Sequence, residues 1–97
     1  MRIDVVGRRV EVTDAIREYA ESKVNKLLKF FDGMQQISVV IEEIKHREFA
    51  VEVVVDVVKH DDLIARATGD DLYAAIDQAA DKAERQIRDY KEKLRLH

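Results

Sequence analysis

The last quarter of the chain limits the fold most strongly, because its apolar side chains recur at helical spacing from Leu72 almost to the C-terminus. The residues on this apolar face are Leu72, Ile76, Ala79, Ala80, Ala83, Ile87, Tyr90 and Leu94. Its alanines carry little bulk, so the helix must lie close against a sheet or another helix. A helix of this length gains most of its stability from packing. The rest of the chain must therefore supply a surface that covers this face.

Four segments have the pattern of β-strands. Residues 2–6 alternate, and residues 37–45 are nearly all apolar in their first half, which is typical of a strand near the sheet centre or covered on both sides. In residues 49–58 the valines at odd positions predict an inward-facing row, and residues 63–68 continue this alternation. Short polar turns join the last three strands, which predicts an antiparallel meander.

A first helix is predicted between the first two strands. Thr13 is a suitable N-cap, an apolar stripe extends to about Phe31, and Asp32-Gly33 provides a stop. The order is then β-α-β-β-β-α, and the first crossover allows strand one to run parallel to its neighbour. We expect an α+β fold: a two-layer sandwich with two helices on one face of a four-stranded mixed sheet. Residues 1–97 should form a single domain.

Composition excludes several classes of function. The chain carries a net charge of −3 and no cysteine, and no apolar run approaches the roughly 18 residues of a membrane span. His46 and His60 lie at opposite ends of the predicted third strand, and no zinc-ligand spacing, nucleophile motif or glycine-rich phosphate loop occurs. We therefore expect a cytoplasmic protein that is not an enzyme and has no metal, cofactor, small-molecule substrate or membrane partner.

Charge is sorted along the last helix. Residues 70–81 carry four aspartates and no lysine or arginine, whereas residues 82–97 carry six basic groups against three acids. This order suits the helix dipole, which favours anions at the N-terminus and cations at the C-terminus. The dipole acts only over the terminal turns, so it does not account for basic groups as far inside the helix as Lys82 and Arg85.

Projection of both helices at about 100° per residue groups the basic side chains into flanks. On the first helix, one flank of the apolar stripe carries Lys23, Lys26 and Lys29, and residues 22–31 contain no acid. On the last helix, one flank carries Lys82, Arg85 and Lys93, and the opposite flank carries Arg88, Lys91 and Arg95. If the helices pack side by side, one flank of each can face a shared groove and neutralise phosphates. The alternative is a solvated surface with ion pairs such as Glu84–Arg88. The residue pattern leaves both interpretations open.

Two long segments resemble one bacterial family. The N-terminal part MRIDVVGRRVEVTDAIREYAESKVNKLLKFFD and the last helix GDDLYAAIDQAADKAERQIRDYKEKL are similar to the ribosome hibernation-promoting factors and the related ribosome-associated inhibitor, protein Y. The most specific signature is Asp-Leu-Tyr-Ala-Ala-Ile-Asp, followed five residues later by Lys82 and then by Glu84-Arg85-Gln86. The similarity covers essentially the full chain.

This resemblance implies a fold similar in outline to double-stranded-RNA-binding domains. It also implies binding to the ribosomal RNA of the small ribosomal subunit at the decoding region. There the protein would block messenger and transfer RNA and inhibit translation during stress or stationary phase. The residues it assigns to RNA binding are Lys23, Lys26, Lys29, Lys82, Arg85, Gln86, Arg88, Lys91 and Lys93. Asp89 departs from the family, because relatives often place a lysine there, and its carboxylate should weaken phosphate attraction near Arg85 and Lys93.

The resemblance also separates the branches of the family. The chain looks like a short form, or an excised N-terminal domain of a long form. Short forms pair inactive ribosomes with a separate ribosome modulation factor, whereas protein Y silences them without pairing, and this chain sits closer to the pairing branch. The alternative function is a protein-interaction module that modulates an alternative sigma factor, or another protein, through an exposed sheet edge. Steep loss of binding with added salt would distinguish phosphate contacts from strand addition.

Overall fold

A computed structural model describes residues 2–30 and 33–95 of the chain. Four strands and two α-helices follow one another in the predicted order, with a short 3₁₀-helix, η1, directly after the first helix. The elements are β1 (Arg2–Arg8), α1 (Asp14–Asn25), η1 (Lys26–Lys29), β2 (Met34–Lys45), β3 (Glu48–Val57), β4 (Leu63–Gly69) and α2 (Leu72–Arg95).

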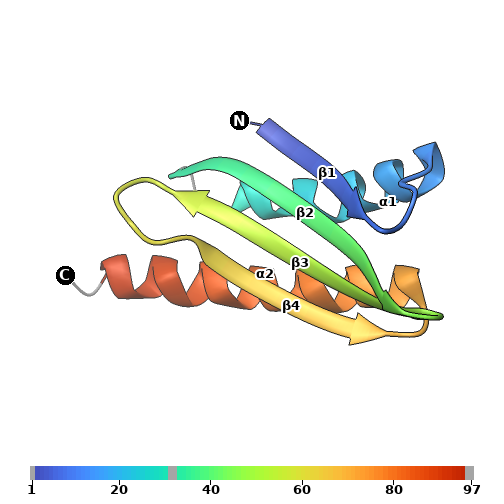
Figure 1. Cartoon of the computed structure of the whole chain (residues 1–97). Helices are drawn as coiled ribbons and strands as arrows, with labels where there is room; N and C mark the ends of the chain where they lie inside the picture. The colour runs from blue at the N-terminus through green and yellow to red at the C-terminus, as the bar shows by residue number, and fades with distance from the viewer. Residues whose placement is uncertain (1, 31–32, 96–97) are drawn as a thin grey trace.

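The sheet has the strand order β1-β2-β3-β4. β1 runs parallel to β2, with Ile3 opposite Ile37, and the other two pairs are antiparallel. Both helices cover the same face, α1 behind β1 and β2 and α2 behind β3 and β4 (Figure 1). The predicted mixed sheet, the antiparallel meander and the two-layer sandwich are therefore confirmed.

The core lies between the sheet and the two helices. The odd-numbered valines of β3 are buried as predicted, whereas Phe49 is only partly buried. Val39 and Val53, which pair across β2 and β3, are both 0% exposed. α2 buries its alanines against this layer, and Ala79 and Ala83 are almost fully covered. The small side chains thus allow the helix to approach the sheet closely. Leu94, in the last turn of α2, is 46% exposed, so the buried stripe ends before it.

The ends of two elements differ from the sequence prediction. β1 continues through Gly7 to Arg8, beyond the predicted residues 2–6. A Cβ at Gly7 would clash with the carbonyl oxygen of Val10 and lie 2.7 Å from Cγ2 of Val12. The loop packs so closely here that only glycine fits without displacing it. The first helix was expected to remain α-helical to about Phe31. Instead it tightens into the 3₁₀-helix after Asn25, as helix C-termini often do.

The helix caps follow the sequence closely. The Thr13 hydroxyl accepts a hydrogen bond from the Ile16 amide at 3.2 Å, and Asp71 accepts one from the Ala74 amide at 3.3 Å. Thr13, the predicted N-cap, therefore begins α1, and Asp71 begins α2 in the same way. The predicted stop at Asp32-Gly33 and the apolar position Phe31 involve residues 31 and 32, which lie outside the described part of the chain.

Candidate RNA-binding surface

Two polar side chains of α2 reach across to the outer edge of the sheet. The Lys82 ammonium donates to the carbonyl oxygen of Arg66, and the Gln86 amide donates to that of Ile64, each at 2.9 Å. Both carbonyls belong to β4, the edge strand beside α2. The two bonds fix these side chains on the β4 side of the helix, and Lys82 makes no ion pair with any residue from 2–30 or 33–95.

Two shallow depressions follow the same side of α2. One, of about 280 Å³, is lined by Lys82, Arg85, Gln86 and Asp89. The other, of about 230 Å³, lies beside the β3–β4 turn and is lined by His60, Leu63, Gln86, Asp89, Tyr90 and Lys93. Because the two share Gln86 and Asp89, they form one continuous surface, which we call the β4 flank. Lys82, Arg85 and Lys93 are its exposed cations.

A different network joins the two helices. The Tyr19 hydroxyl donates to the Asp77 carboxylate at 2.7 Å, and the Lys23 ammonium lies 3.2 Å from the same oxygen. The hydrogen bond from Tyr19 and the nearby lysine charge hold the pKa of Asp77 below its usual value, while the bond to Asp77 raises the pKa values of Tyr19 and Lys23. Tyr73 packs edge-to-face on Tyr19 with ring centroids 4.9 Å apart. Lys23 is therefore half-buried and already paired.

The remaining candidate cations lie on or near the side of α2 that faces the first helix. The Arg88 guanidinium lies 4.7 Å from the Phe30 ring centroid and 3.2 Å from the Glu84 carboxylate. This Glu84–Arg88 ion pair was expected if the helix surface is simply solvated. Lys26 and Lys29 on η1, and Lys91 on α2, are exposed and have no ion pair in the described part of the chain.

These positions show which flank of α2 faces the first helix, a choice that the sequence left open. Aromatic packing and the Asp77 network fill the space between the helices, so Lys82, Arg85 and Lys93 face the β4 edge rather than a shared groove with the first helix. The segment 22–31 has no acid of its own, yet α2 supplies Asp77 to Lys23. Of the nine candidate residues, four lie on the β4 flank: Lys82, Arg85, Gln86 and Lys93. The other five lie on the first helical segment and on the other flank of α2: Lys23 on α1, Lys26 and Lys29 on η1, and Arg88 and Lys91 on α2.

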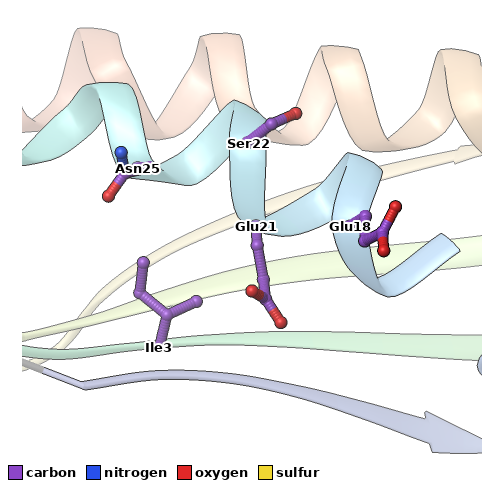
Figure 2. A pocket seen from close by; sticks show the side chains of 5 residues that line it. All are labelled: Ile3, Glu18, Glu21, Ser22 and Asn25. Atoms are coloured by element: carbon purple, nitrogen blue, oxygen red, sulfur yellow. The ribbon is translucent and has the colours of Figure 1, made fainter. Parts of the chain in front are cut away.

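Acidic residues gather on another part of the molecule. A surface pocket of about 320 Å³ between β1 and α1 is lined by Ile3, Glu18, Glu21, Ser22 and Asn25. Figure 2 shows Glu21 pointing toward β1 and Ile3 pointing back toward the helix. Among the described residues, no lysine or arginine lines this pocket. The cations of the β4 flank therefore form a local basic area on a chain whose net charge is −3.

Helix side chains occupy carbonyl groups at both edges of the sheet. On β1 the Arg17 guanidinium donates to the carbonyl oxygen of Val5 at 3.2 Å. On β4 the bonds from Lys82 and Gln86 do the same at two positions. A strand from another protein would have to displace these donors before it could pair with either edge.

The described residues contain no group of three or more potential metal ligands, and none of their charged or polar residues is fully buried. None of their helices is long and apolar enough to cross a membrane.

Sequence reasoning missed Tyr19, Asp77 and the cluster of His60 and Tyr90, whose rings lie edge-to-face at 4.5 Å. From the sequence, Asp77 belongs to the charge gradient of the last helix and to the family signature, but neither assigns it a partner. The partners are far apart in sequence, Tyr19 and Asp77 by 58 residues, so no local spacing signals the contact.

The fold and this surface define a small two-layer α+β protein that presents exposed cations on its helical layer. Comparison with known families agrees. The family described as Sigma 54 modulation protein / S30EA ribosomal protein matches residues 3–95. The chain belongs to this family, which supports a ribosome-associated hibernation role.

Individual relatives match over nearly the whole of this chain. The chain is 37% identical to the ribosome hibernation promoting factor of Escherichia coli strain K12 over 99 residues, covering all of both chains. It is also 37% identical to the ribosome hibernation promotion factor of Lactococcus lactis, but covers 51% of that longer protein. Two solved structures share the fold. The N-terminal domain of Thermus thermophilus Protein Y has a TM-score of 0.82 and 35% sequence identity, and the match covers 93% of this chain and 99% of that one. A ribosomal subunit interface protein from Coxiella burnetii has a TM-score of 0.85 and 27% sequence identity, and the match covers 95% of this chain and 99% of that one.

Proposed function

We propose that this protein is a cytoplasmic ribosome hibernation factor that binds the small ribosomal subunit at the decoding region and blocks messenger and transfer RNA. The observation that carries the proposal is the row of exposed cations on the β4 flank, Lys82, Arg85 and Lys93, which make no ion pair within the described part of the chain. Cations without an internal anion can neutralise phosphates at no cost in broken ion pairs. The relatives include a ribosome hibernation promoting factor and a ribosomal subunit interface protein, which supports the ribosome as the source of those phosphates.

The mechanism is occlusion. The domain measures 46 × 21 × 19 Å, and both helices pack on one sheet through a continuous core. Such a rigid wedge holds a channel closed by occupying it, so no bond is made or broken. Its contacts go mainly to backbone phosphates and to RNA shape, as is usual for structured RNA. We further propose that it favours inactive, paired ribosomes, acting with a separate ribosome modulation factor, in line with its full-length match to the Escherichia coli factor.

The nine candidate residues contribute unequally to this proposal. Eight are cationic, and two of these, Lys23 and Arg88, already pair with carboxylates at 3.2 Å. The six that remain within the described part of the chain are Lys26, Lys29, Lys82, Arg85, Lys91 and Lys93. We assign phosphate binding chiefly to these six, and a hydrogen-bonding role to Gln86. Lys23 is proposed to contribute less than its sequence position suggests.

The alternative, a protein-interaction module that works by strand addition, receives less support. Donors from the helices occupy carbonyl groups on β1 and on β4, so partner binding through either edge would begin by breaking existing hydrogen bonds. We therefore favour the ribosome-binding proposal over modulation of a sigma factor through a sheet edge.

Co-sedimentation with isolated small ribosomal subunits tests the proposal. The test variant carries Lys82→Glu, Arg85→Glu and Lys93→Glu. Its control reverses three exposed charges at the far end of the sheet, and carries Arg8→Glu, Lys45→Glu and Arg47→Glu. Both variants change the net charge equally. We expect the first to lose binding by about 100-fold or more at physiological salt, and the second to bind nearly as the parent does.

Two results would overturn the proposal: absence of the parent protein from the subunit pellet, or equal losses in the two variants. Equal losses would show that net charge alone governs binding. Competition with messenger RNA on the same subunits tests the decoding-region part, because an occluding factor must be displaced by, or displace, the message.

A further inference from the structure

Asp89 is the one acid in the wall of both depressions of the β4 flank. Arg85 and Lys93 lie one turn on either side of it, about 6 Å away along the helix axis. Within the described residues, its exposed carboxylate nevertheless makes no ion pair with either of them and no hydrogen bond. Asp89 therefore offers two open acceptor oxygens in the middle of a cationic row.

The depression beside the β3–β4 turn has the chemistry of a base-binding site. Its wall includes the rings of His60 and Tyr90 and the side chain of Leu63, with Gln86, Asp89 and Lys93 around them. Aromatic rings stack on nucleobases with little dependence on sequence. At about 230 Å³ the depression is smaller than the ~300–1,000 Å³ typical of drug-sized ligand sites, which suits a single ring system.

We propose that this depression receives one unpaired guanine of the bound RNA and that Asp89 reads its Watson–Crick edge. Guanine presents two adjacent donors there, N1–H and the exocyclic amino group, which match the two oxygens of an ionised carboxylate. Each other base has a single donor group at that edge, N3–H in uracil and the exocyclic amino group in cytosine and adenine. None of them offers two adjacent donors, and each places an acceptor beside its donor, which would meet the carboxylate with like partial charge. Arg85 and Lys93, on either side of Asp89, hold the flanking phosphates.

The inference rests on the proposed function, since it names what the β4 flank recognises in RNA. It also gives a reason for an acid at a place where phosphate attraction alone would favour a base. A carboxylate in this position weakens binding to the RNA backbone but adds discrimination between bases. Contacts to phosphates position the protein on the RNA, whereas contacts to base edges specify the sequence.

Short single-stranded oligouridines with one central guanine, adenine, cytosine or uracil test this by fluorescence anisotropy over a series of salt concentrations. We expect the parent protein to prefer the guanine oligonucleotide by about fivefold, the lower end for a bidentate base contact, because the site is exposed. Asp89→Asn should remove the preference. Asp89→Lys should remove it while binding all four oligonucleotides more tightly, with the salt slope steeper by about 0.7.

Asp81→Asn is the matched control, since it neutralises another exposed acid of α2 outside both depressions and should keep the guanine preference. His60→Ala should lower the affinity for all four oligonucleotides by removing part of the stacking surface. Equal affinity of the parent for all four bases would overturn the inference, as would an Asp89→Asn variant that binds all four more tightly by one common factor. Small-subunit binding measured in parallel separates this failure from failure of the proposed function itself.

Discussion

The salt dependence of RNA binding should separate the unpaired cations of this protein from the paired ones. Each phosphate neutralised on a single strand steepens the plot of log affinity against log salt by about 0.7, and on a duplex by about 0.9. Six unpaired candidates would therefore give a slope of about −4 to −5 if all of them meet phosphates. The double variant Lys82→Gln, Arg85→Gln should make the slope shallower by about 1.4 to 1.8.

The comparison variant removes an existing ion pair instead. Lys23 and Asp77 lie 3.2 Å apart, so their charges already compensate each other in the free protein. Lys23→Gln together with Asp77→Asn leaves the net charge unchanged, and the asparagine side chain can still accept from Tyr19. If Lys23 stays with Asp77 in the complex, this variant keeps the parental salt slope.

Titration of fluorescently labelled small subunits, or of an rRNA fragment from the decoding region, over a salt series would measure both slopes. Circular dichroism would first confirm that each variant is folded. A drop in slope of about 0.7 or more for the ion-pair variant would refute the reasoning, because it would mean that Lys23 leaves Asp77 to bind phosphate. An unchanged slope for the Lys82 and Arg85 variant would refute it at the β4 flank.

Three further predictions concern the fold around the site. Replacement of Lys82 and Gln86 by methionine exposes β4 carbonyls, so the variant should self-associate with rising concentration in sedimentation velocity; a monomer throughout would show that these side chains do not guard the edge. Because the pKa of Asp77 is lowered on folding, its contribution to stability is present above its unfolded pKa and is lost as pH falls through the lower folded value. In urea unfolding over a pH series, the free energy of unfolding of Asp77→Asn should therefore fall less at acid pH than that of the parent. If the two proteins lose stability in parallel as the pH falls, the result would argue against the network. Gly7→Ala should destabilise the fold by about 1–3 kcal/mol in chemical denaturation, whereas Gly69→Ala, with no heavy atom near its added Cβ, should not destabilise it; equal effects would contradict the close approach at β1.

Charge sorting reconciles the acidic total with an RNA-binding role. Glu18 and Glu21 line a pocket on the β1 side, whereas Lys82, Arg85 and Lys93 lie on the β4 flank at the other edge of the sheet. Charges farther apart than about 8 Å are largely screened at physiological ionic strength. A polyanion at the β4 flank therefore meets the local cations, while the net negative charge opposes indiscriminate binding to nucleic acid elsewhere.

The sequence alone determined every feature that depends on a short repeat or a single cap. Alternating valines in residues 49–58 predicted the buried row that includes Val53, and Thr13 predicted the first turn of α1. The stripe through Ile87 predicted which face of the last helix is buried. These signals are local, because strand and helix periods repeat within a few residues. The basic flanks of α2 could be projected for the same reason.

Tertiary structure decided which of those cations are available. Lys23 forms an ion pair with Asp77, and Lys82 donates a hydrogen bond to a carbonyl oxygen of β4. Both partners are far away in sequence. Such partners depend on how whole elements pack, which no spacing along the chain encodes. The same packing places Asp89 and His60 in the wall of one depression. From the sequence alone, Asp89 could be explained only as an acid that weakens phosphate attraction. Periodicity fixed which way each side chain points, and packing of helices on the sheet decided what it meets.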